Sequence, residues 1–310
     1  MTSHRVILDV DTGYDDAVAI MMAARNPAII LEGITVAAGN QTLPKTLRNT
    51  LNICSALDID APVYAGMTRP LIAEQIPAPL IHGESGFDGP VFGTCTKNPE
   101  PKHAVQFIID TIMSHEIGEI TIVAVAPLSN IAMAVRLEPA IIPRVREIIL
   151  MGGSITGGNI TPSAEFNIHA DPEAAAIVFG CGIPTTMIPL DVTTTVILDH
   201  ERLSLLSKIP GRAAEIFGVS MTRYTEACER YIGECAAMHD PCCIACVVNP
   251  ELFTFESYRV DIELIGTCTR GRTVVDVHGV SGKIPNVMVA RSIDSTGFWT
   301  LLAESLRQYR

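Results

Sequence analysis

The chain has 310 residues, of which 48% are hydrophobic, and it carries a formal net charge of -12 at pH 7. The negative charge argues against a nucleic-acid partner, because proteins that bind phosphate backbones usually carry a basic face. No apolar run reaches the ~20 residues that a membrane-spanning helix needs, so we expect no membrane anchor and no signal peptide.

Short apolar segments alternate with helical patterns through the first part of the chain. The expected strands are 6–8, 31–36, 63–65, 120–125, 148–151 and 185–188. The expected helices between them are 17–25, 43–57, 104–114, 129–135 and 172–179. Apolar strands separated by helices are typical of parallel pairing with helices on both faces. The sequence therefore predicts an α/β fold with an open, mostly parallel central sheet flanked by helices.

The rest of the chain is less regular. A mostly helical pattern is followed by a short helix, three strands and a terminal helix, expected at 203–231, 241–248, 258–265, 272–277, 286–290 and 298–309. No internal repeat, low-complexity segment or linker-like stretch interrupts the sequence. We therefore predict a single catalytic domain over residues 1–310, with extra strands and helices at its C-terminal end.

Polar segments follow several of the expected strands. They contain Asp11, Asn40, Asn130, Asn159 and Asp191. Ligands of open α/β sheets bind at the carboxyl ends of the strands. We therefore expect these loops to converge on one site at that edge.

The segment VILDVDTGYDDAVAI contains four aspartates, Asp9, Asp11, Asp15 and Asp16. Asp9 and Asp11 share one face of a strand end, and Asp15 and Asp16 fall near the first turn of the next helix, whose N-terminus relieves part of their repulsion. A bound cation would relieve the rest, and oxygen ligands favour calcium or magnesium over zinc. The alternative is an Asp-rich helix cap without a metal.

A second constellation is His239-Asp240-Pro241. Pro241 suits the first position of a helix, so Asp240 either only caps that helix or supplies a further carboxylate for the cation. His239 is a candidate proton donor near neutral pH.

Two further segments carry polar residues. Glu165 and Asn167 would point the same way in an extended segment and, with Asn159, form a fork for vicinal hydroxyls; a solvated loop is the alternative. The glycine-rich IHGESGFDG carries His82 and is typical of a loop that closes over a substrate, or simply of a long surface loop.

The nine cysteines are not spaced like a disulfide framework, which favours reduced thiols in a cytoplasmic protein. Cys243 and Cys246 form a C-x-x-C next to Cys242, but a thiolate zinc site would need a second ligand pair at comparable spacing. Because PCCIACVVNP has no polar face, we expect a buried helix lined with thiols.

The opening DVDTGYDDAVAI resembles the D-x-D-x-G-x-D-D pattern of the nucleoside hydrolases, which are metal-dependent nucleoside N-ribohydrolases. Further blocks resemble this family in the family's order: AAGNQTLPKTLRN, HGESGFDGP, PLSNIAMA, IILMGGSITGGNITPSAEFNIHADPEAA, PLDVT and MHDPC. The resemblance runs from Val6 to the expected terminal helix. It implies hydrolysis of the N-glycosidic bond of ribonucleosides to free base and ribose.

The resemblance also implies roles for individual residues. Calcium would be bound by Asp11, Asp16, Asp240 and the strand-end carbonyl of Val125, with Asp11 also activating a calcium-bound water and Asp9 supporting the metal ligands. The ribose hydroxyls would be held by Asp15, Asn40, Asn159, Glu165 and Asn167. His82 and His239 correspond to the base-side histidines that help the departing base accept a proton. Members are commonly tetramers, so a homo-oligomer acting in cytoplasmic nucleoside salvage is expected.

The base preference follows from finer resemblances. His239, directly before the last metal aspartate, resembles the pyrimidine-preferring and inosine–uridine branches, and Tyr231 resembles a substrate contact of the bacterial pyrimidine-specific members. Those members place a glutamine where Ala227 stands here. Uridine and cytidine are the expected substrates, and a broader inosine–uridine hydrolase is the alternative.

Two other classes share part of the pattern. A phosphohydrolase of the haloacid dehalogenase type would use Asp9 as nucleophile and needs a downstream lysine near an acidic metal loop, a context that Lys102 and Lys208 lack. A non-catalytic nucleoside sensor would have an incomplete catalytic set, whereas the complete set is present. Both classes are weaker explanations of the sequence.

Overall fold

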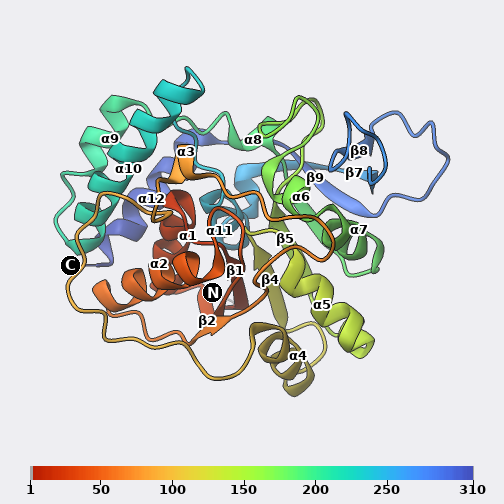
Figure 1. The fold of residues 1–310 in the computed structure, drawn as a ribbon, viewed down its shortest axis with the longest axis horizontal. Coiled ribbons are helices and arrows are strands. Elements are labelled where there is room, and N and C mark those ends of the chain that lie inside the picture. The colour runs from red at the N-terminus through yellow and green to blue at the C-terminus, as the bar shows by residue number, and fades with distance from the viewer. Residues whose placement is uncertain (1–2, 310) are drawn as a thin grey trace.

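The computed structural model describes residues 3–309, and a single twisted sheet runs through the molecule (Figure 1). Within this range, nine strands pair in the order β3-β2-β1-β4-β5-β6-β9-β7-β8. Their bounds are β1 His4–Val10, β2 Ile29–Val36, β3 Val63–Ala65, β4 Ile120–Ala124, β5 Glu147–Met151, β6 Thr185–Ile188, β7 Phe253–Ile262, β8 Thr273–Asp276 and β9 Val287–Ile293. Pairing is parallel from β3 to β9, and β7 and β8 add antiparallel strands at one edge.

Helices cover both faces of the sheet (Figure 1). Their bounds are α1 Tyr14–Ala24, α2 Leu43–Ala56, α3 Pro79–His82, α4 Ala104–Ser114, α5 Ser129–Leu137, α6 Phe166–Ala170, α7 Pro172–Gly180, α8 Leu190–Thr193, α9 His200–Leu206, α10 Arg212–Tyr231, α11 Pro241–Val248 and α12 Ser295–Arg307. Two 3-10 turns lie at Pro139–Ile141 and Pro250–Leu252. The predicted α/β class, with an open, mostly parallel sheet and extra C-terminal strands and helices, is confirmed.

The core is divided by the sheet because side chains alternate along each strand. Val6 and Leu8 of β1 are fully buried in one cluster, which contains the apolar sides of α1, α10, α11 and α12. Ile7, between them, is fully buried in the other cluster, with the apolar sides of α4, α5 and α7. Burial on both faces explains why the parallel strands are apolar throughout.

The strand order reverses direction next to β1. The chain builds β2 and β3 on one side of β1 and then returns to build β4 on the other side. This reversal leaves a crevice outside the carboxyl ends of β1 and β4, where open α/β sheets bind their ligands. The loops after these two strands begin with Asp11 and Val125.

Several element boundaries differ from the sequence predictions. The single helical region expected at 203–231 is two helices, because Pro210 lacks an N–H and Gly211 has φ 131°. Helix α1 begins at Tyr14 rather than at residue 17, since Asp16 accepts a hydrogen bond of 2.9 Å from the Gly13 N–H and completes the first turn. The short helices α3, α6 and α8 were not predicted.

The cysteines of α11 are buried, as the apolar pattern of this segment predicted. Cys242 and Cys243 are fully buried in the core, and the Sγ of Cys242 donates to the carbonyl of Met238 at 3.1 Å. Within residues 3–309 all nine cysteines are free. No helix in that range is both long enough and apolar enough to cross a membrane.

Candidate active site

The loop after β1 places Asp16 beneath the carboxyl end of the sheet. Asp16 Oδ1 accepts a hydrogen bond of 3.0 Å from the Asp11 N–H, and Oδ2 accepts from the Gly13 N–H and from Nδ2 of Asn40, at 2.9 and 3.1 Å. Asn40 comes from the loop after β2, and its own N–H donates to Oδ2 of Asp11 at 2.6 Å. Backbone and amide donors therefore hold two aspartates and fix their direction.

Four carboxyl groups share this buried corner: Asp11, Asp15, Asp16 and Asp240. Oxygens of Asp15, Asp16 and Asp240 all lie within 4.8 Å of one another. Desolvation and the neighbouring carboxylates raise the pKa of Asp240 well above its usual value, and the same causes raise that of Asp16 to about 6. Asp240 thus joins the cluster, and it directly precedes α11, which begins at Pro241.

The atoms available as metal ligands at this corner suit a hard divalent cation. Among the described residues, Oδ1 of Asp11 is buried and has no hydrogen-bond partner. All ligands available at this corner are oxygens, which suit calcium or magnesium. A cation would also remove the repulsion that raises the pKa values of the cluster.

Asp9 lies one layer deeper, on β1. Its Oδ1 accepts hydrogen bonds from the hydroxyl of Thr35 and from Nδ2 of Asn130, at 2.5 and 2.8 Å. Its carbonyl accepts from the N–H of Val125 at 2.8 Å and so fixes the start of the loop after β4. Burial raises the pKa of Asp9 to about 7.

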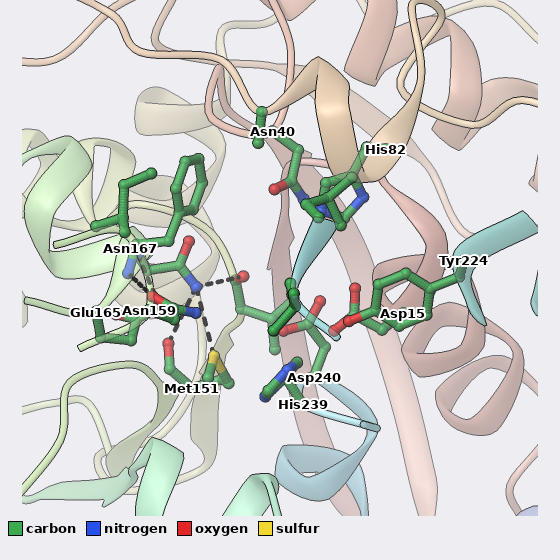
Figure 2. Close-up of a pocket in the computed structure, with 16 residues that line it drawn as sticks. Asp15, Asn40, His82, Met151, Asn159, Glu165, Asn167, Tyr224, His239 and Asp240 are labelled. Carbon is green, nitrogen blue, oxygen red and sulfur yellow. Dashed lines mark hydrogen bonds between the residues drawn. The ribbon is translucent and has the colours of Figure 1, made fainter. Parts of the chain in front are cut away.

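A cavity of about 150 Å³ opens above the acidic corner (Figure 2). Nine of the predicted site residues line it: Asp15, Asn40, His82, Val125, Asn159, Glu165, Asn167, His239 and Asp240. Asp11 and Asp16 lie below its floor and are fully buried. Residues from seven separate loops and helices thus meet in one place, as expected for the loops that contain Asn40 and Asn159, whereas Asn130 and Asp191 do not line the cavity.

The wall after β5 is built differently from the expectation. Glu165 is the N-cap of α6 and not part of an extended segment: its carboxylate accepts from the N–H groups of Gly153, Asn167 and Ile168, at 2.8 to 3.1 Å. Glu165 is 2% exposed, so the alternative of a solvated loop is also wrong at this residue. Burial raises the pKa of Glu165 to about 7 despite these donors.

Asn167 and Asn159 complete this wall. Nδ2 of Asn167 donates to the carbonyl oxygens of Val125 and Met151, at 3.0 and 3.2 Å (Figure 2). Asn159 lies at the exposed rim, where its Oδ1 accepts from the N–H of Phe166 at 2.9 Å. The amide nitrogen of Asn159 therefore remains available to a ligand.

Two histidines line the cavity away from Glu165 and Asn167: in the view, His82 lies above Asp15, and His239 lies at the bottom beside Asp240 (Figure 2). His82, at the end of α3, stacks against Tyr14 and Tyr224 with ring centroids 5.7 and 6.1 Å apart, and burial lowers its pKa to about 4. His239 precedes Asp240, and burial also lowers its pKa. The glycine-rich segment after His82 is attached to α2 through hydrogen bonds, including one of 3.0 Å from Asn49 to the carbonyl of Ser85.

Tyr231 is placed outside this cavity. It is 51% exposed at the end of α10 and lines a separate hollow together with Ala227. The aromatic side chain of α10 that does line the cavity is Tyr224, two helical turns earlier, which the sequence analysis missed. The only sequence signal for Tyr224 is its spacing of seven from Tyr231, which puts both on a similar side of a helix.

Comparison with known proteins agrees with this geometry. A sequence model of the family described as "Inosine-uridine preferring nucleoside hydrolase" matches residues 6–300. The chain belongs to the nucleoside hydrolase family. The pyrimidine-specific ribonucleoside hydrolase RihB of Escherichia coli O17:K52:H18 is 48% identical over 311 residues, covering 100% of this chain and 99% of the relative.

Solved structures of nucleoside hydrolases share the fold of this hydrolase. A purine-preferring ribonucleoside hydrolase from Gardnerella vaginalis has a TM-score of 0.91 and 31% identity, covering 98% of this chain and 99% of that one. A plant nucleoside hydrolase, PpNRh1, has a TM-score of 0.90 and 30% identity over the same shares. The hydrolase therefore acts on the N-glycosyl bond of nucleosides.

Proposed function

We propose that this hydrolase cleaves pyrimidine ribonucleosides, uridine and cytidine, to the free base and ribose, with calcium as its metal. The observation that carries the proposal is the convergence in one cavity of an acidic corner, a polar wall and two histidines. The full-length similarity to a relative named pyrimidine-specific supports the base preference.

We infer that Asp11, Asp16, Asp240 and the carbonyl of Val125 hold the cation. When bound, a divalent cation lowers the pKa of a water molecule and offsets the charge of the carboxylates. Asp11 accepts the proton of the attacking water, since its Oδ1 has no other partner among the described residues. Asn40 keeps the other oxygen of Asp11 fixed.

Residues of both the acidic corner and the wall formed by Asn159, Glu165 and Asn167 hold the ribose. Asp15, Asn40, Asn159, Glu165 and Asn167 offer acceptors and amide donors for its hydroxyls. Breaking the bond to the base leaves positive charge on the ribose ring, as in the hydrolysis of O-glycosides. Buried carboxylates near the ring stabilise that charge, and fixed positioning contributes several kcal/mol to lowering the barrier.

His82 and His239 lie on the base side and assist the departing base. Tyr224 forms an aromatic wall beside His82, against which a base ring packs. Ala227, where the pyrimidine-specific pattern has glutamine, lies with Tyr231 in the neighbouring hollow. We propose that Tyr231 contacts the base only after a rearrangement of the end of α10.

The broader inosine–uridine specificity is the second candidate, favoured by the description of the matching family. The deciding experiment measures ribose release from uridine, cytidine, inosine and adenosine, for the wild type and Asp11→Ala, with and without a calcium chelator. Release from uridine and cytidine alone, abolished by the variant and the chelator, supports the proposal. Comparable release from inosine supports the broader enzyme, and release that survives chelation contradicts the metal role.

We further propose that the enzyme is a cytoplasmic homotetramer. The free thiols of the described chain suit a reducing compartment. Light scattering coupled to gel filtration tests the assembly: a mass of about four chains supports it and a monomer contradicts it.

A further inference from the structure

A threonine hydroxyl outside the cavity lining contacts the ring of His239. Oγ1 of Thr193, the last residue of α8, lies 2.8 Å from Nδ1 of His239. Thr193 is fully buried, and within residues 3–309 this imidazole nitrogen is the only side-chain hydrogen-bond partner of its hydroxyl. The ring of His239 lines the cavity on the side of Asp240 (Figure 2).

The burial of Thr193 decides the direction of this hydrogen bond. If the hydroxyl accepted a hydrogen bond from Nδ1–H, its own O–H would be left without an acceptor in a buried position, which costs about 1–3 kcal/mol. If the hydroxyl donates to Nδ1, both groups are satisfied. A neutral imidazole with an accepting Nδ1 carries its proton on Nε2.

We propose that Thr193 is a positioning residue that holds His239 as the Nε2–H tautomer, so that the ring offers a hydrogen-bond donor to the base. This inference rests on the proposed function, because it takes the base to lie against His239. The inference also sets a requirement for the substrate. The base must carry a hydrogen-bond acceptor that faces His239, as the carbonyl oxygen next to the glycosidic nitrogen of uracil and cytosine does.

A backbone N–H group holds His82 in the same tautomer. Nδ1 of His82 accepts from the N–H of Tyr14, in the first turn of α1, at 3.4 Å. An N–H group can only donate, so this contact also leaves the proton on Nε2. The base side of the cavity thus offers two imidazole donors, one set by a side chain and one by the main chain.

The chemical consequence concerns the leaving group. When the bond between the anomeric carbon and the base nitrogen breaks, the electron pair moves to the base, and negative charge spreads to its carbonyl oxygen. The Nε2–H of His239 donates a hydrogen bond to that oxygen and stabilises its negative charge. The ring itself need not lose a proton. Over the whole reaction, hydroxide from water adds to the ribose carbon and the proton of water ends on the base.

The test compares Thr193→Val, which removes the hydroxyl at similar volume, with Thr193→Ser, which keeps it. Thr194→Val is the matched control, because the hydroxyl of Thr194 donates to the carbonyl of Leu190 at 2.7 Å and has no other hydrogen-bond partner within residues 3–309. Each variant is assayed with uridine and with p-nitrophenyl β-D-ribofuranoside. The phenolate of the second substrate leaves without help from a donor.

We expect Thr193→Val to lower kcat for uridine by about 10- to 100-fold, which is at or below the lower end of the roughly 10²–10⁴-fold contribution of a positioned acid, because the imidazole itself remains in place. KM and the kcat for the p-nitrophenyl riboside should change by less than about threefold, because binding and ribose chemistry are untouched. Thr193→Ser should restore the kcat for uridine, and Thr194→Val should match the wild type. An equal loss on both substrates, or no loss on uridine, overturns the inference.

A second readout needs no activity. In histidine-labelled protein, the ¹⁵N shifts of His239, assigned with His239→Gln, should show a protonated Nε2 and an unprotonated Nδ1 in the wild type and a mixture in Thr193→Val. A protonated Nδ1 in the neutral wild-type ring overturns the inference. If the wild type cleaves neither substrate, the proposed function fails, while the shifts still decide the tautomer.

Discussion

The carbonyl oxygen of Val125 accepts a hydrogen bond of 3.0 Å from Nδ2 of Asn167, which joins a proposed metal ligand to a proposed ribose ligand. The same amide also holds the carbonyl of Met151, at 3.2 Å. These contacts join the ends of β4 and β5 under the cavity. Hydrogen bonds therefore connect the acidic corner to the wall that contains Asn159, Glu165 and Asn167.

Asn167→Ala should destabilise the calcium-free protein more than the calcium-loaded one. Removing the amide leaves two buried carbonyl groups without this donor, at a cost of about 1–3 kcal/mol each. Calcium would satisfy the carbonyl of Val125 and recover part of the loss. Thermal unfolding with and without calcium measures the difference, and Asn159→Ala, at the exposed rim, is the control. A loss that calcium does not reduce would contradict the role of Val125 as a ligand.

Gly39→Ala should strongly reduce calcium binding and activity. A Cβ at Gly39 would lie 2.1 Å from Oδ2 of Asp11, so the carboxylate would have to move. Gly180→Ala, where an added Cβ meets nothing within 4 Å, is the matched control and should retain both properties. We expect at least about a tenfold loss of kcat/KM for Gly39→Ala, equivalent to ~1.4 kcal/mol. Calorimetric calcium titration and ribose release measure the two effects, and wild-type behaviour of Gly39→Ala would refute the placement of Asp11.

The stability of the calcium-free protein should depend on pH through Glu165. Burial raises the pKa of Glu165 from 4.5 to about 7, so the folded chain keeps a proton that the unfolded chain has lost. The unfolded state then binds fewer protons, and the contribution of Glu165 to stability declines as pH rises from about 4.5 to about 7.

Urea unfolding of the wild type and Glu165→Gln in a chelator measures this dependence. The stability of the wild type relative to the variant should fall across that pH interval and level off above it. A difference that stays constant, or that grows with pH, would show that Glu165 is ionised in the folded protein throughout the interval.

Substitutions of Asp15 and Asp16 should have different effects, although the two residues are neighbours in one cluster. Asp16→Asn should weaken calcium binding by at least about 100-fold, since a carboxylate is removed from the cation. Asp15→Asn should mainly raise KM for uridine, because Asp15 lines the cavity whereas Asp16 lies beneath it. Calcium titration with ribose kinetics distinguishes them. Equal losses of calcium affinity would make Asp15 a metal ligand, which the distances within the cluster permit.

Much of the site is encoded locally. The strand ends at Asp11 and Val125 follow from apolar runs that stop at polar residues, and the first turn of α1 follows from the acidic pair after Gly13. Such patterns depend on the period of neighbouring residues and on helix capping, which act over a few positions. The family resemblance added roles to residues already marked by these patterns.

Tertiary structure decided the rest. Only the strand order brings Asp11 and Val125 to one crevice, because pairing between strand edges is not set by the period of any single strand. Glu165 became a helix cap because buried N–H groups of Gly153 and α6 converge on its carboxylate. Thr193 and His239, 46 residues apart, meet because the segment after α8 pairs with the segment before α11: the N–H of Met238 donates to the carbonyl of Val196 at 3.0 Å. The sequence by itself determined which groups stand at the strand ends, and the fold determined which of them touch, because contacts between distant residues depend on how the whole chain packs.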